Sequence, residues 1–217
     1  MKENILIFLR HGCNLPLAVA VPICLGMLDA RGTLLAGMPW LALGVLIFMF
    51  MEYVTHRFAL HAEPIKHPFI GKLQRRLHYD HHIEPARLDL LFLPPWFGMP
   101  LIVGYANLYF FVSGSLDVML AILAGNLIGL LYYEWVHFVA HIPVTPMTGW
   151  GRWMKKYHLL HHFKNEHYWF GVTNPLGDLI AGTFRDKDKT EKSPTTKFLF
   201  EEIEEQWRET SARNAAN

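Results

Sequence analysis

The stretch VMLAILAGNLIGLLYYEWVHFVAH, residues 118–141, combines the two features that decide the fold. Residues 118–133 carry no charge, and two histidines, His137 and His141, follow shortly after Glu134. A helix rises about 1.5 Å per residue, so about 20 residues are needed to cross a hydrocarbon core of about 30 Å. If the helix continues through Glu134, this segment is predicted to span a membrane and to carry paired imidazoles at its end.

Three further runs without charge give the rest of the predicted bundle. Residues 32–51 and 90–116 are each long enough to form a span alone. The run 15–28 is short, so it is predicted to be either a span extended by polar flanks or a re-entrant segment. We therefore predict an all-α integral membrane bundle of about four transmembrane helices. Two hairpins are expected, with tight turns at 29–32 and 113–117.

The distribution of basic residues predicts how this bundle is oriented. With four crossings, both termini and the histidine-bearing segments lie on one side of the membrane. Of the 20 Lys and Arg residues, Arg31 alone falls on the other side. Basic residues favour the cytoplasmic face, so the termini and a helical cap carrying the histidines are predicted to be cytoplasmic. The host membrane is either a bacterial inner membrane or the endoplasmic reticulum.

The composition agrees with a membrane protein and argues against other classes. Apolar residues make up 52% of the 217 residues, and charged residues only 18%. The formal net charge of +1 indicates no nucleic-acid partner. Cys13 and Cys24 match no disulfide or zinc spacing.

Ten of the 13 histidines fall in four clusters that repeat one order. A histidine pair follows an uncharged run, and an HxxHH triplet comes about 20 residues later, twice over. On an α-helix, positions i+3 and i+4 lie about 60° and 40° to either side of position i, so each triplet presents its imidazoles on one face. The first pair has i, i+5 spacing, which fits best where the helix frays or tightens. The predicted metal ligands are His56, His61, His78, His81, His82, His137, His141, His158, His161 and His162.

Ten neutral imidazoles are enough for two coordination spheres and too many for one ion. Imidazole binds zinc, copper, iron and nickel, so the ligand type leaves the metal open. A structural zinc needs only four ligands, and the chain contains no HExxH. Two adjacent histidine sites therefore favour a dinuclear redox centre. A histidine-lined metal transporter remains an alternative of another class, although transporters usually place their ligands near mid-bilayer. A haem protein would leave both triplets unexplained.

At these residues the chain resembles the fatty acid hydroxylase/sterol desaturase superfamily, most closely its fatty acid 2-hydroxylase branch. The resemblance covers residues 48–184 and is carried by three stretches, EYVTHRFALHAEP, HYDHH with a following FLPP, and YHLLHHFKNEHYWFGVTNPLGDLIAGT. A single membrane domain over 1–217 is expected, with 185–217 as a charged tail that includes a peripheral helix. That helix is predicted over 197–213, with Phe200, Ile203 and Trp207 on one side.

The resemblance implies an oxidoreductase, a non-haem di-iron monooxygenase that hydroxylates a fatty acyl chain or a sphingolipid acyl group next to the carboxyl carbon. It implies two iron ions, with zinc as another occupant, no haem, and the consumption of dioxygen and two electrons. No catalytic residue beyond the metal ligands and no other cofactor site is expected. A sterol or carotenoid hydroxylase, or a desaturase, remains an alternative on the same scaffold. The chain contains no HPGG, so a separate donor such as a cytochrome b-type protein or a ferredoxin is expected.

Two details depart from the family pattern. Tyr79 and Asp80 replace the usual Gly-x within the first triplet, and Gly177 stands where a tryptophan commonly precedes the motif aspartate, here Asp178. Because neutral imidazoles bring no charge, nearby carboxylates are expected to anchor histidine N–H groups. The candidates are Glu52, Asp80, Glu134 and Asp178, and for each of them the alternative is an exposed or capping carboxylate.

Overall fold

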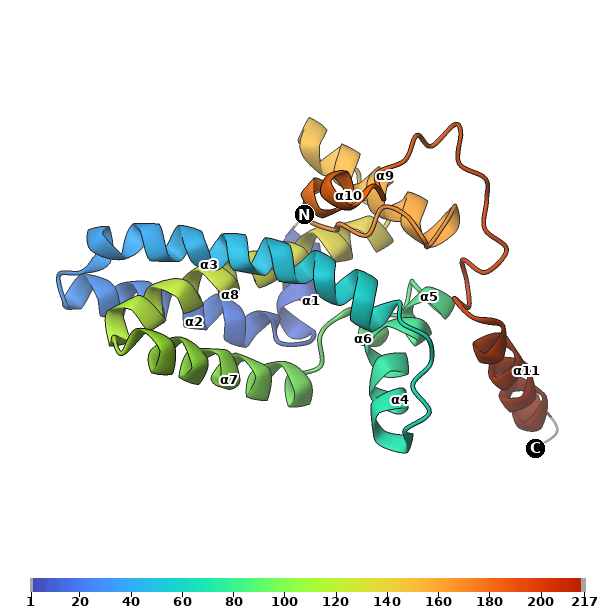
Figure 1. The fold of residues 1–217 in the computed structure, drawn as a ribbon, viewed down its shortest axis with the longest axis horizontal. Helices are drawn as coiled ribbons and strands as arrows, with labels where there is room; N and C mark the ends of the chain where they lie inside the picture. Colours follow the sequence, from blue (N-terminus) through green and yellow to red (C-terminus); the bar gives the residue numbers. More distant parts are fainter. Residues whose placement is uncertain (1, 216–217) are drawn as a thin grey trace. The chain divides into compact units, whose positions relative to one another are not determined.

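The computed structural model describes residues 2–215, and the described residues form helices joined by loops, without strands (Figure 1). The predicted all-α class is therefore confirmed. The chain divides into two compact units. The first contains residues up to Glu52 together with Phe92–Ile142, and the second contains the rest.

The first unit is the helical bundle. Its helices are α1 (Lys2–Arg10), α2 (Asn14–Ala30), α3 (Leu34–Val54, in this unit up to Glu52), α7 (Pro95–Ser113) and α8 (Leu116–His141). Three helical segments are long and apolar enough to cross a membrane, namely Leu34–Leu60, Leu88–Ser113 and Leu116–His141. The helices α1 and α2 pass the same test only together, and they are bent by 92° where they meet. The prediction of about four membrane helices agrees with this count, and the first is a broken span or a re-entrant segment.

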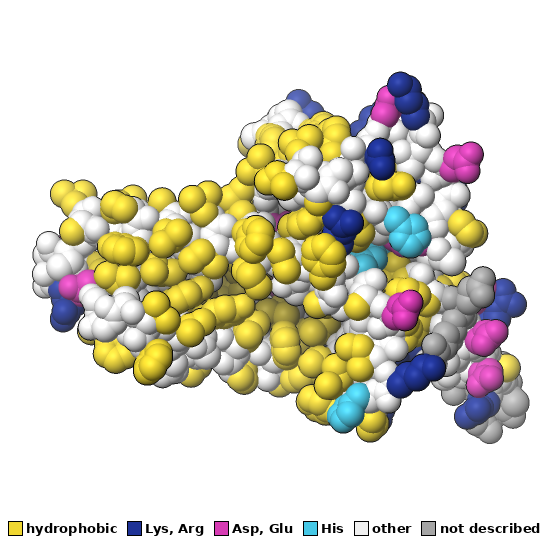
Figure 2. Space-filling view, in the orientation of Figure 1, with side chains coloured by type: hydrophobic (Ala, Val, Ile, Leu, Met, Phe, Trp, Pro, Cys, Tyr) yellow, Lys and Arg dark blue, Asp and Glu magenta, His cyan; other side chains and the backbone are white. Residues whose placement is uncertain are grey.

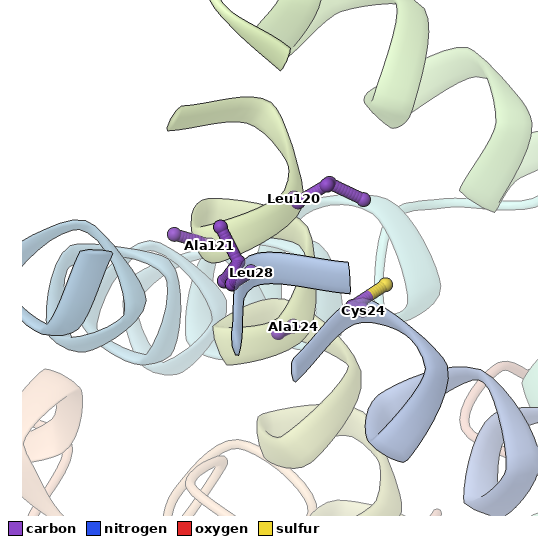
Figure 3. Close-up of a cluster of buried hydrophobic side chains, with 5 residues drawn as sticks. All are labelled: Cys24, Leu28, Leu120, Ala121 and Ala124. Carbon is purple, nitrogen blue, oxygen red and sulfur yellow. The ribbon is translucent and has the colours of Figure 1, made fainter. Parts of the chain in front are cut away.

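Small side chains let α2 and α8 pack closely. Leu28 and Cys24 of α2 lie against Leu120, Ala121 and Ala124 of α8, and all five are buried (Figure 3). Lipid tails are as apolar as leucine, so helices in a membrane gain little from hiding apolar surface from each other. Close packing of small residues is therefore what holds this pair together.

Two glycines bring α3 and α8 together. A Cβ built on Gly125 would lie 2.1 Å from the carbonyl oxygen of Leu41, and one built on Gly44 would lie 2.1 Å from that of Ile122. Asn126 adds a hydrogen bond from its side-chain amide to the carbonyl oxygen of Gly44 at 2.5 Å. The two backbones touch where any side chain would separate them.

We expect Gly125→Leu to destabilise the protein strongly, because the new side chain has to push α3 away. Overpacking of this kind costs about 1–3 kcal/mol, and here the obstacle is backbone, which yields less than a side chain. Thermal unfolding in detergent measures the effect. Gly104→Leu is the matched control, since a Cβ on Gly104 in α7 meets nothing within 4 Å. Equal melting temperatures for the two variants would contradict this account of the packing.

The bundle exposes apolar side chains over its sides and charges at its turns. Leu35, Phe50 and Phe111 are each more than 60% exposed, and Figure 2 shows apolar side chains over the visible faces of α3 and α7. At the ends of the hairpins, Arg31 forms an ion pair with Asp117, so the α2–α3 turn is tied to the start of α8. Surface of this kind is suited to lipid, with the ion pair outside it.

The second unit carries most of the histidines on short helices. These are η1 (Thr55–Leu60) and η2 (Arg75–Tyr79), which are π-helices, and α4 (Pro68–Gln74), α5 (Asp80–Ile83), α6 (Leu88–Leu91), α9 (Gly149–Phe163), α10 (Leu176–Ala181) and α11 (Glu201–Ala215). Leu199, just before α11, and Ile203, in its first turn, are buried with Tyr79 and Ile83. The side chain of Trp207 lies outside the described residues.

Candidate metal centre

Five imidazoles from four parts of the second unit converge on one point. One ligand nitrogen from each lies within 4.8 Å of all the others. The Nε2 atom of His61 is central, at 2.7 Å from Nε2 of His78 and 3.0 Å from Nε2 of His161. We call this group the first histidine set, and its members are His56, His61, His78, His82 and His161.

A π-helix explains how the pair with i, i+5 spacing can serve one site. On an α-helix, His56 and His61 would point about 140° apart. A π-helix closes i→i+5 hydrogen bonds with about 4.4 residues per turn, so the two rings diverge by only about 50°. The backbone N–H of His61 donates to the carbonyl oxygen of His56 at 3.1 Å, which is such a bond. The sequence predicted a frayed or tightened helix here, and the structure shows a widened one.

A second group of imidazoles lies beside the first. Ligand nitrogens of His81, His158 and His162 lie within 4.8 Å of one another. The rings of His82 and His162 stack with centroids 4.0 Å apart and planes at 17°, which joins the two groups. The second unit therefore holds parts of two adjacent histidine sets.

The two triplets divide their rings between these groups. His78 and His82 belong to the first set, whereas His81 between them belongs to the second group. In the other triplet the division is reversed, because His161 joins the first set while His158 and His162 form the second group. Positions i+3 and i+4 differ by about 100° around a helix, so a triplet lying between two sites sends rings to both. The sequence predicted one shared face per triplet and did not predict this division.

The remaining predicted ligands, His137 and His141, lie in the last turns of α8 in the first unit. Their ring centroids are 5.2 Å apart, and His137 is buried. Their membership of a metal site stays a prediction from the sequence.

Backbone carbonyls fix the tautomers of three rings in the first set. Nδ1 of His56 lies 2.5 Å from the carbonyl oxygen of Phe170, and Nδ1 of His161 lies 2.8 Å from that of Tyr168. Nδ1 of His82 likewise lies 3.1 Å from the carbonyl oxygen of Thr196. A carbonyl oxygen only accepts, so each Nδ1 donates its hydrogen, and Nε2 keeps the lone pair that a metal requires.

The donor set fits a cation. The pKa values of His61 and His78 are lowered well below the usual range, first by burial and then by the neighbouring imidazoles, so both rings are neutral. Neutral rings with nitrogens 2.7–3.0 Å apart match ligands of one ion, since two nitrogens bound at about 2.0–2.1 Å and at a right angle lie about 2.9 Å apart. The buried Nε2 of His56 has no hydrogen-bond partner within the described part of the chain. A metal ion would satisfy it.

Asp178 holds the loop that supplies two of these carbonyls. It is fully buried and accepts hydrogen bonds from the backbone N–H of Phe170 at 2.9 Å and of Gly171 at 2.7 Å. The hydroxyl of Thr183 donates to the same carboxylate at 2.6 Å. Asp178 therefore acts on His56 through the loop backbone, whereas the sequence left open a direct bond to a histidine or an exposed or capping role.

Two of the other predicted anchors, Asp80 and Glu134, contact groups other than histidines. Asp80 pairs with Arg75 at 3.2 Å, and Glu134 accepts from the backbone N–H of Leu93 at 3.1 Å. Glu52 is buried near the end of α3. For His56, His82 and His161, backbone carbonyls accept from the ring N–H groups. For Glu52 the anchoring role stays a prediction.

Glu166 is a buried carboxylate that the sequence did not single out. Its Oε1 accepts from the hydroxyls of Ser193 at 2.9 Å and Thr195 at 2.5 Å. These contacts fix the segment whose Thr196 carbonyl accepts from His82. The position of Glu166 could have drawn attention to it, because it is an acidic residue within the long stretch after the second triplet that resembles the family.

We expect Glu166→Gln to lower stability by about 1–3 kcal/mol, because hydrogen bonds to a buried charge are replaced by weaker ones to an amide. Thermal unfolding and metal content of the detergent-purified protein measure the loss. Glu191→Gln changes an exposed carboxylate nearby and is expected to cost less than about 0.5 kcal/mol. A Glu166→Gln variant as stable as this control would show that the carboxylate does not hold the segment.

The departure at Gly177 has a packing explanation. A Cβ at Gly177 would lie 2.2 Å from the ring of Tyr53, whose hydroxyl is 2.8 Å from that of Thr183. Arg57 donates to the same Tyr53 hydroxyl at 2.8 Å. The Tyr53 ring occupies the space that a side chain at 177 would need, so the tryptophan common at this position would not fit here.

The fold and the histidine sets together define an all-helical membrane protein with a candidate dinuclear centre. The model of the family described as fatty acid hydroxylase matches residues 41–183, and the chain belongs to this family. This confirms the resemblance seen in the sequence.

Individual relatives agree with the assignment. The dihydroceramide fatty acyl 2-hydroxylase FAH1 of Arabidopsis thaliana is 31% identical over 161 residues, which cover 73% of this chain and 62% of that protein. The ceramide very long chain fatty acid hydroxylase SCS7 of Saccharomyces cerevisiae is 32% identical over 160 residues, covering 73% and 40%. A solved structure of full-length Scs7p, in which only the hydroxylase domain is visible, has a TM-score of 0.75 at 28% identity and covers 83% of this chain and 68% of that one. The chain thus spans about two fifths to three fifths of these curated relatives.

Proposed function

We propose that this protein is a membrane monooxygenase that hydroxylates acyl chains of lipids or fatty acids at the 2-position. The observation that supports this most is the first histidine set, with five imidazole nitrogens gathered within 4.8 Å. The family model matches residues 41–183, which include all five of these histidines. The relatives include a protein named as a fatty acyl 2-hydroxylase and one named as a very long chain fatty acid hydroxylase. Their names concern acyl chains, which is why we assign the acyl 2-position in preference to a sterol or carotenoid.

The proposed cofactor is a pair of iron ions. When bound, such a pair supplies the activation of dioxygen that side chains cannot provide. The first set would hold one ion, and His81, His158 and His162 would hold the other. The chain's own contribution is to present neutral Nε2 atoms, to fix their tautomers through backbone carbonyls and to exclude water by burial. A separate protein, such as a cytochrome b-type protein or a ferredoxin, is proposed to supply two electrons.

We extend the ligand assignment to His137 and His141. This rests on the repeated order in the sequence, in which a pair and then a triplet follow a span twice. The first pair, His56 and His61, joins the set that takes two rings from the first triplet. By analogy, we assign the second pair to the second group, which takes two rings from the second triplet.

Metal analysis of single variants tests this division. The intact protein is expected to bind about two irons per chain. His141→Ala is expected to lose about one, as is His61→Ala, whereas His167→Ala, at an exposed ring, should lose none. Full metal content in His141→Ala would overturn the assignment of the second pair.

The activity is tested by expressing the chain in a host without 2-hydroxy lipids. Mass spectrometry of the lipids is expected to show 2-hydroxy acyl chains, with one oxygen atom derived from isotopically labelled dioxygen. An unsaturated product would show a desaturase, and a hydroxylated sterol or carotenoid would show another substrate class. Metal uptake by vesicles without any oxidised product would support the transporter alternative.

The orientation is also a proposal. The excess of basic residues in 1–14, 52–89 and 134–217 supports placing both termini and the histidines in the cytoplasm. Labelling of single engineered cysteines in intact cells tests it. A cysteine at Thr33 is expected to react with an impermeant reagent, whereas one at Lys192 is expected to be protected.

A further inference from the structure

A cavity lies on the side of α9 that faces away from the histidines. Its volume is about 410 Å³, within the range of about 300–1,000 Å³ typical of small-ligand sites. Its lining includes Trp153, Lys156, Tyr157 and Leu160, which are spaced i, i+3, i+4 and i+7 along one helical face. At 100° per residue, the centre of this face lies about 140° from the centre of the histidine face of α9. The cavity is therefore separate from the candidate metal centre.

The cavity combines an aromatic wall with a cationic rim. Trp153, Tyr157, Trp169 and Phe184 supply the wall. Trp169 and Tyr157 are buried, and Trp169 is held by a hydrogen bond from its indole Nε1 to the carbonyl oxygen of Arg185 at 3.1 Å. A wall of rings fixed in this way can contact the apolar part of a ligand without rearrangement.

The rim carries three cations and one carboxylate. Lys156, Arg185 and Lys187 line the cavity together with Asp186. Lys187 is already paired with Asp188 at 2.6 Å, so Lys156 and Arg185 are the cations best placed to meet a ligand. The guanidinium of Arg185 lies 5.3 Å from the ring centroid of Tyr168, which restricts its position.

The charge decides which ligand suits the site. An aromatic wall alone would also suit a quaternary ammonium group, but the excess of cations on the rim disfavours it. A phosphate ester offers oxygens that guanidinium and ammonium groups bind well. Next to the cavity in sequence, α10 exposes Leu179 and Ile180, the latter by 87%, which is apolar surface suited to acyl chains.

We propose that this cavity binds the phosphate head group of an anionic membrane phospholipid. Lys156 and Arg185 would bind the phosphate, and the aromatic wall would contact the glycerol and first methylene groups. Because the same chain has candidate membrane spans, the protein is expected to be surrounded by lipids, so the effective concentration of such a ligand is high. The proposal is independent of the hydroxylase activity and of any metal.

Titration of the full-length protein in detergent tests this, with the binding of dioctanoyl phosphatidic acid followed by native mass spectrometry. Saturable binding is expected, together with at least about tenfold weaker binding of dioctanoyl phosphatidylcholine, whose charge does not suit the rim. The double variant Lys156→Gln/Arg185→Gln is expected to bind phosphatidic acid about tenfold more weakly or worse. Lys192→Gln, which removes an exposed cation outside the cavity, should bind it like the parent.

Three outcomes would overturn the proposal. These are equal binding of the two lipids, unchanged affinity in the double variant, and competition by inorganic phosphate at the same concentration as the lipid, which would indicate an ion site. Unaltered melting temperature and metal content in the double variant are needed to assign a loss of binding to the removed charges. If the double variant is unstable, Arg185→Lys is measured, with an expected partial loss because the forked contact to phosphate becomes a single one.

Discussion

Replacement of His161 by alanine is expected to abolish hydroxylated product while leaving the protein in the membrane. The ring is fully buried, and its Nε2 lies 3.0 Å from Nε2 of His61 at the centre of the first set. Loss of a group that only orients a ligand commonly costs about 10–100-fold in metal affinity or activity. Removal of the ligand itself is expected to cost more than about a hundredfold, and the metal of the first set should be lost with it.

Lipid mass spectrometry and metal analysis on the same preparation measure both effects. His167→Ala is the matched control, because His167 is six residues away, 66% exposed and only loosely paired with Glu166 at 3.4 Å. Size-exclusion chromatography in detergent shows whether either variant is misfolded. Full activity in a folded His161→Ala protein would remove His161 from the ligands and undermine the proposed site.

Replacement of Asp178 by alanine is expected to have the second largest effect, because its carboxylate holds the loop backbone behind His56. The change leaves the N–H groups of Phe170 and Gly171 and the hydroxyl of Thr183 without their buried acceptor. Each such loss costs about 1–3 kcal/mol, so the loop should loosen or the protein should melt far earlier. The tautomer of His56 then loses its support from the Phe170 carbonyl.

Thermal unfolding and metal content again provide the measurements. Asp178→Asn is a second informative variant. Its amide keeps one acceptor oxygen but places an N–H group against a backbone donor, so it is expected to recover little of the stability lost in Asp178→Ala. Asp188→Asn, at an exposed carboxylate paired with Lys187, should behave like the parent. If Asp178→Ala has the same melting temperature and metal content as Asp188→Asn, the loop is held by other contacts.

Local sequence patterns predicted the membrane helices well. Long uncharged runs have few other stable solutions, so 118–133 and all but the first two residues of 32–51 fall within candidate spans. The run 15–28, whose length alone left two possibilities, lies within α2, which passes the span test only together with α1 across a 92° bend. For the glycines of α3 and α8, the sequence showed small residues but did not show that the backbones would touch at Gly44 and Gly125.

The sequence by itself determined that this chain is a membrane helical protein and that its histidines are spaced for metal binding, because hydrophobic length and helical period are local properties. Only the tertiary structure decided that each triplet divides its rings, that a π-helix aligns His56 with His61, and that Asp178 and Glu166 act through loop carbonyls. These features depend on partners as far apart as His56 and Phe170, which are 114 residues distant in the chain. Such pairings are set by packing and by the need to satisfy buried polar groups, and no local period records them.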